Sequence, residues 1–188
     1  MALEHRSGPM TFAEYQALPE GSYNLIDGEL IVSPAPSPWH QQIQFRIHSA
    51  LHSHVHLHKL GRVYGAPVDV VLRQEKPPVV VQPDVLFVAH GGTAEVTKCW
   101  IAGPPALVVE VVSPGNARLD LVRKYEVYGR YGVGEYWLVL PELEHVQVLR
   151  QAASGFAHPE VLEGKDVLTS SLLPGFKLPL PALFAPED

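Results

Sequence analysis

The chain has 188 residues, which is enough for one domain with a sizeable core and too few for two domains of typical size. Hydrophobic residues make up 46% of the sequence and charged residues 18%, so the composition is that of a globular protein and excludes a disordered one. The formal net charge of −6 argues against a surface coated with Lys and Arg for phosphate binding. A local basic groove or bound cations would still be able to offset phosphate charge.

No apolar stretch of the sequence approaches the roughly 20 residues that a membrane-spanning helix needs. The first residues lack the apolar core of a signal peptide. The single cysteine, Cys99, excludes an internal disulfide bond and a zinc site built from cysteines. We therefore expect a single domain over residues 1–188, a cytoplasmic location and no membrane partner.

The N-terminal third of the chain predicts a short helix, a hairpin and a long helix. Thr11 and Glu14 have the spacing of a capping box, so residues 11–18 are predicted to form the short helix. Asp27-Gly28 stands between two apolar runs and predicts a two-residue hairpin turn. Residues 38–59 have helical periodicity. The face predicted to point inward consists of His40, Ile43, Ile47, Ala50, His54 and Leu57.

Strand patterns dominate the middle of the chain. Residues 62–73 predict one long strand or a pair of strands, and residues 90–105 predict a long connection with room for one helical turn. Further strands are predicted from apolar runs at residues 79–81, 84–88 and 106–112. Asn116 is predicted to cap a helix over residues 117–130.

The last third predicts strands at residues 135–140 and 145–150, and then one or two more strands and a helical turn within residues 155–184. A strand–helix–strand crossover over residues 106–140 pairs its two strands in parallel, whereas hairpins are antiparallel. The predicted fold class is therefore α/β (α+β). It consists of a mixed central β-sheet flanked by helices, with an N-terminal β-hairpin and extra C-terminal strands.

One acidic residue, Glu110, interrupts the apolar run at residues 106–112. A strand this apolar is predicted to be buried on both faces, where a carboxylate must be neutralised, paired or bound to a metal. Asp84 opens another apolar run directly after Pro83. Two carboxylates on neighbouring central strands are the minimum equipment for a divalent-metal site. The alternatives are that Asp84 only begins a strand after a turn and that Glu110 pairs with a buried arginine.

The helix predicted after the Glu110 strand carries a lysine on its inward face. Its inward stripe steps by four and three residues and consists of Ala117, Leu121, Lys124, Tyr128 and Tyr131. A lysine that points inward needs a partner, and Glu110 is our candidate for it. The alternative is an ordinary surface pair between Asp120 and Lys124, which have i,i+4 spacing.

Five histidines lie within the second half of the predicted long helix. His48, His52 and His56, and separately His54 and His58, have the i,i+4 spacing that can bind zinc or nickel. Neither an acid nor a cysteine nearby in the sequence completes such a site. We therefore interpret the cluster as a solvated helical face with some adventitious metal affinity.

Seven stretches of the chain, taken in order, resemble the Uma2-like endonuclease family, a domain of unknown function within the PD-(D/E)xK restriction-endonuclease-like superfamily. The stretches are Ile26-Asp-Gly-Glu-Leu30, Ser33-Pro-Ala-Pro-Ser-Pro-Trp-His40, Gln82-Pro-Asp84, Leu107-Val-Val-Glu-Val-Val-Ser-Pro114, Asp120-Leu-Val-Arg-Lys-Tyr125, Gly132-Val-Gly-Glu-Tyr-Trp137 and Leu172-Leu-Pro-Gly-Phe-Lys-Leu178. The resemblance spans about residues 11–184 and implies a restriction-endonuclease-like core. The usual motif lysine would fall at Val112. The resemblance implies that Lys124 on the following helix takes over its role.

The resemblance further implies a metal-dependent endonuclease that hydrolyses phosphodiester bonds in DNA. Asp84, Glu110 and the backbone carbonyl of Val111 would hold Mg²⁺ or Mn²⁺, both of which prefer oxygen ligands. The metal would lower the pKa of a bound water and polarise the phosphoryl oxygen. Lys124 would orient that water or stabilise the developing negative charge. Because related nucleases often dimerise, the resemblance also implies a homodimer.

Three auxiliary candidates accompany this site. Glu29, next to the hairpin turn, is a candidate for a further metal or water contact, and the alternative is a solvated hairpin residue. His40 is a candidate for phosphate contact or proton transfer, and the alternative is packing at the start of the helix. Asp69 is an auxiliary acid or a structural residue.

Two other functions stay open at this point. One is a catalytically silent fold that serves as a nucleic-acid or protein interaction module. The other is a carboxylate-metal hydrolase of a smaller phosphate ester, which the acidic net charge fits better. The presence together of Asp84, Glu110 and Lys124 favours the endonuclease, because a degraded enzyme would usually have lost one of them.

Overall fold

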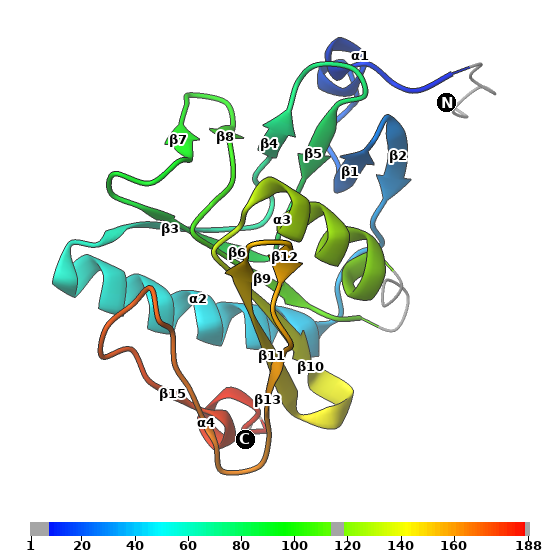
Figure 1. The fold of residues 1–188 in the computed structure, drawn as a ribbon. Helices are drawn as coiled ribbons and strands as arrows, with labels where there is room; N and C mark the ends of the chain where they lie inside the picture. Colours follow the sequence, from blue (N-terminus) through cyan, green and yellow to red (C-terminus); the bar gives the residue numbers. More distant parts are fainter. Residues whose placement is uncertain (1–7, 114–118, 187–188) are drawn as a thin grey trace.

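The computed structural model describes residues 8–113 and 119–186, which form two main β-sheets and a small two-stranded sheet with helices packed around them (Figure 1). The helical segments are α1 (Phe12–Gln16), α2 (Pro38–His58), the π-helical segment η1 (Leu119–Lys124), α3 (Tyr125–Tyr131), the 3₁₀ turn η2 (Pro141–Leu143) and α4 (Leu180–Leu183). In these described ranges, no helix is both long and apolar enough to cross a membrane. The predicted fold class, a mixed α/β protein, is confirmed.

The first main sheet has the strand order β2-β1-β5-β4-β8-β7. Its strands are β1 (Tyr23–Ile26), β2 (Glu29–Val32), β4 (Val70–Arg73), β5 (Val79–Val81), β7 (Glu95–Val96) and β8 (Ile101–Ala102). β4 and β8 pair in parallel, and all other neighbours are antiparallel. The prediction of a plain connection over residues 90–105 is therefore wrong. Two-residue strands are too short to produce an alternating pattern that a sequence reveals.

The second main sheet has the strand order β12-β11-β10-β9-β6-β3, and β13 also pairs with β11. Its strands are β3 (Gly61–Gly65), β6 (Val85–Ala89), β9 (Leu107–Val111), β10 (Glu135–Leu140), β11 (His145–Ala152), β12 (Gly155–Phe156) and β13 (Glu160–Leu162). The predicted crossover is confirmed, because β9 and β10 pair in parallel. The predicted strand pair within residues 62–73 corresponds to β3 and β4, which lie in different sheets.

The C-terminal part contains more short strands than predicted. Besides β12 and β13, β14 (Val167–Leu168) and β15 (Leu178–Pro179) form the separate two-stranded sheet, and α4 follows directly. Asn116, predicted to cap the helix after β9, lies outside the described residues. The helix as described begins at Leu119 with η1 and continues as α3.

The two strongest local signals of the sequence form as predicted. The Thr11 hydroxyl accepts the backbone N–H of Glu14, and the Glu14 carboxylate accepts the backbone N–H of Thr11, which completes the capping box of α1. Asp27 and Gly28 both adopt left-handed backbone angles, with φ of 51° and 83°. Positive φ at both central residues is the requirement of a type I′ turn, whose twist suits a two-stranded hairpin.

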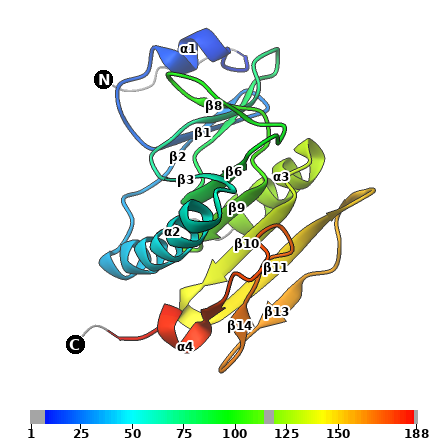
Figure 2. The same cartoon turned by 90° about the vertical axis from the view of Figure 1, so that its left-hand side faces the viewer.

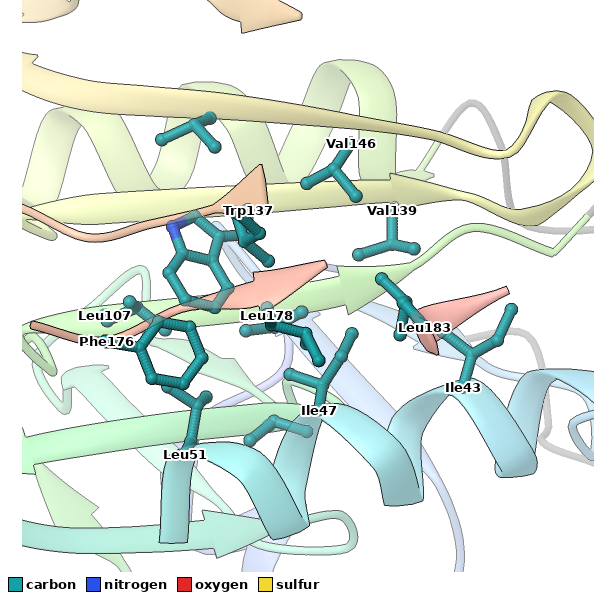
Figure 3. Close-up of a cluster of buried hydrophobic side chains, with 14 of the residues drawn as sticks. Ile43, Ile47, Leu51, Leu107, Trp137, Val139, Val146, Phe176, Leu178 and Leu183 are labelled. Carbon is teal, nitrogen blue, oxygen red and sulfur yellow. The ribbon is translucent and has the colours of Figure 1, made fainter. Parts of the chain in front are cut away.

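Helix α2 covers one face of the second sheet, and the larger hydrophobic core lies between them (Figure 3). Its buried positions are His40, Ile43, Gln44, Ile47, Leu51 and Val55. The predicted face is correct in the first half of the helix and wrong in the second, where Leu57 is 74% exposed. The predicted steps average 3.5 residues, whereas a straight α-helix turns once in 3.6, so the predicted face drifts by about 20° per heptad.

The other face of the second sheet packs against α3 and the first sheet, so β6, β9 and β10 are buried on both faces. In Figure 2, α2 and α3 lie on either side of β9. Alternate residues of β9 point to opposite sides: Leu107 and Val109 belong to the core under α2, and Val108 belongs to the core under α3. Glu110 has the same parity as Val108, so its side chain points toward α3.

Candidate active site

The chain passes from the first sheet to the second between β5 and β6, and Asp84 lies in this crossing segment, immediately before β6. Three groups from other elements surround it. Asp84 Oδ2 accepts the backbone N–H of Val111 at 2.7 Å, and the Asp84 carbonyl accepts Nε2 of Gln44 at 2.8 Å. His40 Nε2 lies 3.3 Å from Asp84 Oδ2. Asp84 is therefore held by β9 on one side and by the first turns of α2 on the other.

Glu110 on β9 is buried, with an exposed fraction of 2%, and each of its carboxylate oxygens has a donor from the helix on that side. Lys124 Nζ donates to Glu110 Oε2 at 2.7 Å, and the Tyr128 hydroxyl donates to Glu110 Oε1 at 2.6 Å. The predicted contact between Lys124 and Glu110 is present, and Lys124 itself is only 4% exposed. Glu110 thus pairs with this lysine. The side chain of Asp120, the alternative partner, lies outside the described residues.

The local helix geometry explains why the predicted stripe is correct at Lys124 but wrong at Leu121. Leu121 was expected to point inward, yet it is 39% exposed. Residues Leu119–Lys124 are π-helical, so one turn takes more residues than in an α-helix and the stripe shifts there. Tyr128, in the regular α3, keeps its predicted inward position. π-Helical turns within helices are frequently found at functional sites.

Asp84 and Glu110 face the same pocket. β6 and β9 pair antiparallel with Val85 opposite Val109, and one further step of this register places Asp84 opposite Glu110. Residues opposite each other in such a ladder have Cβ atoms about 4.5–5.5 Å apart, a spacing that suits two carboxylates sharing one ion. The pocket has a volume of about 380 Å³. Among the residues that the structure describes, its ionisable lining residues are His40, Asp84, Glu110 and Lys124.

Two auxiliary candidates do not reach this pocket. Glu29 has a 67% exposed side chain that pairs with Arg123 at 2.9 Å, as expected for a solvated hairpin residue. Asp69 accepts hydrogen bonds from the Tyr15 hydroxyl and from Gln82 Nε2, both at 2.8 Å. Burial raises the pKa of Tyr15 well above its ordinary value, and the charge of Asp69 and the hydrogen bond to it raise it further. The placement of Asp69 matches the structural alternative, because it ties α1 to the segment that leads to Asp84.

The histidines of α2 form a column along the helix. The rings of His48 and His52 stack at 6.0 Å and those of His52 and His56 at 5.9 Å. Partial burial lowers the pKa of His48, and the charge of His52 lowers it further. In residues 8–113 and 119–186, no group of three His, Cys, Asp or Glu side chains is arranged to hold a metal ion.

The two carboxylates of the candidate pocket suit some metal ions better than others. A structural zinc site takes four protein ligands, usually Cys and His, and two carboxylates do not supply them. Mg²⁺ is typically held by one or two carboxylates and keeps several waters, and Mn²⁺ accepts the same oxygen ligands. The pair Asp84 and Glu110 fits such an ion, with backbone carbonyl groups and water as its remaining ligands.

The sequence did not single out two residues of this site. Tyr128 lay on the predicted inward stripe, four residues after Lys124, and that position is the only signal for its contact with Glu110. Gln44 follows the predicted inward residue Ile43 and supports the Asp84 backbone. A polar residue beside an inward stripe is usually exposed, so its pattern gave no reason to choose it.

The fold and the pocket together indicate the class of protein to which this chain belongs. A mixed α/β core with two acids and a lysine at one pocket is the arrangement expected of restriction-endonuclease-like proteins. The chain belongs to the Uma2 family, whose model is described as "Putative restriction endonuclease" and matches residues 12–181. Its function is therefore nuclease-like.

Comparison with solved structures agrees with this fold. The chain is similar to the crystal structure of a "putative nuclease" of DUF820 from Anabaena variabilis, with a TM-score of 0.77 and 22% sequence identity. The similarity covers 94% of this chain and 98% of the other. No match was found among curated proteins.

Proposed function

We propose that this protein is a divalent-metal-dependent endonuclease that hydrolyses phosphodiester bonds in DNA. The observation that carries the proposal is the buried contact of 2.7 Å between Lys124 Nζ and Glu110 Oε2 in the pocket that Asp84 also lines. A lysine is seldom buried. Here the ammonium group of Lys124 lies at a pocket that two acidic side chains also line. This constellation joins residues from the crossing segment, β9 and η1.

The proposed roles follow from these positions. Asp84, Glu110 and the backbone carbonyl of Val111 would hold Mg²⁺ or Mn²⁺, which when bound would supply an activated water and neutralise charge on the phosphoryl group. Lys124 places a positive charge where negative charge develops during hydrolysis. His40, beside Asp84 on the pocket wall, contacts the phosphate or moves a proton. Glu29, whose exposed side chain pairs with Arg123, has no direct role.

The test is cleavage of supercoiled plasmid in the presence of Mn²⁺ or Mg²⁺, with EDTA as the negative control. The wild type should nick or linearise the plasmid only with metal. Asp84→Asn, Glu110→Gln and Lys124→Met should each lose activity by about 10²-fold or more, as removal of one stabilising group in an active site usually does. Glu29→Gln is the matched control, since it removes an acid outside the pocket, and it should cleave like the wild type.

The outcome distinguishes the three functions considered. Cleavage that is unchanged in Asp84→Asn and Glu110→Gln would refute the proposed site. Complete absence of cleavage in the wild type would favour an interaction module. Hydrolysis of a small aromatic phosphate ester without plasmid cleavage would favour the smaller substrate. A cytoplasmic location and a homodimer stay predictions from the sequence, to be tested by localisation and by light scattering.

A further inference from the structure

The two oxygens of Glu110 are held from different sides. Lys124, which donates to Oε2, lines the pocket together with Glu110. Tyr128, which donates to Oε1, is absent from the pocket lining and has an exposed fraction of 0%. Oε1 is therefore held from the protein interior, and Oε2 is on the side of the cavity.

We propose that Tyr128 is a positioning residue that fixes the Glu110 carboxylate with Oε2 facing the pocket as the metal-binding oxygen. This inference rests on the proposed function and adds to it an orientation for one ligand. It assigns the two donors separate tasks: Tyr128 orients the carboxylate, and Lys124 acts in the pocket. Tyr128 acts through Glu110 and does not touch the substrate.

The rigidity of the two donors supports this division. The Tyr128 ring is packed in the core under α3 and makes an edge contact with Tyr136 at a centroid distance of 5.1 Å. Its hydroxyl therefore has one position. Lys124 has a flexible four-carbon stem and can follow a substrate group while its charge stays in the pocket. A carboxylate oxygen has two lone pairs, so Oε2 can accept the lysine and bind a cation together.

The hydroxyl of Tyr128 should therefore determine metal affinity. Hydrogen-bond partners that orient a metal ligand typically contribute a factor of about 10 to 100 in affinity. Without the hydroxyl, the Glu110 carboxylate loses the donor that holds Oε1, so its orientation is less fixed before the ion binds. The expected effect of Tyr128→Phe is Mn²⁺ binding that is about 10-fold weaker.

The experiment compares two Tyr→Phe variants from the same helix. Tyr128→Phe removes the hydroxyl and keeps the ring. Tyr131→Phe is the matched control, because Tyr131 Oη is buried without a hydrogen-bond partner in the part of the chain that the structure describes. Mn²⁺ binding to the full chain without DNA is measured by electron paramagnetic resonance, and the fold is checked by circular dichroism. Cleavage is then measured as a function of Mn²⁺ concentration.

The proposal expects Tyr128→Phe to raise the Mn²⁺ concentration for half-maximal cleavage about 10-fold while saturating Mn²⁺ restores most of the rate. Lys124→Met should show the reverse, a lost rate with little change in the half-maximal concentration. Wild-type Mn²⁺ affinity in Tyr128→Phe, or loss of its fold, would overturn the positioning role alone. Failure of the wild type to bind Mn²⁺ would overturn the proposed function as well, so the two failures are distinguishable.

Discussion

Glu110 and Lys124 form a buried ion pair. Whether Glu110→Ala raises or lowers the free energy of unfolding depends on this partner of Glu110. From the sequence alone, Glu110→Ala is expected to leave stability unchanged or to raise it, because it removes a buried charge. In the structure the two side chains are 2% and 5% exposed and 2.7 Å apart. Glu110→Ala therefore takes away the carboxylate that compensates a buried ammonium, and it also removes the acceptor of the Tyr128 hydroxyl.

The magnitude follows from the burial of both partners. Breaking a buried ion pair by removal of one partner costs about 3–5 kcal/mol, so Glu110→Ala and Lys124→Met should each lower the free energy of unfolding by roughly this amount. Replacing both partners by apolar residues of similar size, as in Glu110→Leu with Lys124→Met, is often neutral or stabilising. The double variant should therefore unfold within about 1 kcal/mol of the wild type or above it. The two changes should thus be strongly non-additive.

Urea unfolding at pH 7 in EDTA, followed by circular dichroism and tryptophan fluorescence, measures Glu110→Ala and a double-mutant cycle. The cycle consists of the wild type, Glu110→Leu, Lys124→Met and the double variant. Glu29→Ala is the control, since it breaks an exposed ion pair with Arg123 and should cost less than about 1 kcal/mol. The reasoning fails if Glu110→Ala unfolds like Glu29→Ala, or if the effects of the two pair substitutions simply add.

Two further predictions concern buried polar groups away from the pocket. Glu135 is completely buried and accepts hydrogen bonds from Trp137, Ser170 and Ser171, so Glu135→Ala should lower the free energy of unfolding by about 3–5 kcal/mol in urea titrations. A loss below about 1 kcal/mol would contradict the role of this carboxylate in fastening the C-terminal segment to β10. Tyr15→Phe should cost about 1 kcal/mol at neutral pH through the lost bond to Asp69. Because the folded state raises the pKa of Tyr15, the unfolded chain loses its proton first as the pH rises above about 10, and wild-type stability falls there. The advantage of the wild type over Tyr15→Phe should therefore shrink above pH 10 in urea titrations at successive pH values, and a constant difference would contradict this linkage.

Features set by neighbouring residues could be predicted from the sequence. The capping box at Thr11 and Glu14 and the turn at Asp27-Gly28 depend on a few consecutive residues, and both form as predicted. The burial of Glu110 was also predictable, because a strand formed by a continuous apolar run is buried on both faces and carries its single acid with it. The inward direction of Lys124 followed from helical spacing alone.

Features set by distant parts of the chain could not be predicted in the same way. The periodicity of β3 and β4 indicates strands but says nothing of their assignment to different sheets. The π-helical segment at Leu119–Lys124 moves Leu121 outward, and no residue type in this segment predicts a π-helical turn. The sequence did not indicate that Glu135 is a buried acid, because two of the residues that donate to it, Ser170 and Ser171, lie 35 and 36 residues away along the chain.

The charge balance of the pocket explains why the proposed chemistry requires a metal ion. Among the described residues that line it, two are acids, Asp84 and Glu110, and one is a lysine, Lys124, whose charge is matched by Glu110. The formal charges of these three described side chains sum to one negative charge, which repels a phosphodiester. A bound divalent cation reverses this sign, so one event creates both the attraction for the substrate and the means to activate water. The acidic net charge of the chain is therefore compatible with a nuclease that attracts DNA through a bound metal ion and not through many Lys and Arg side chains.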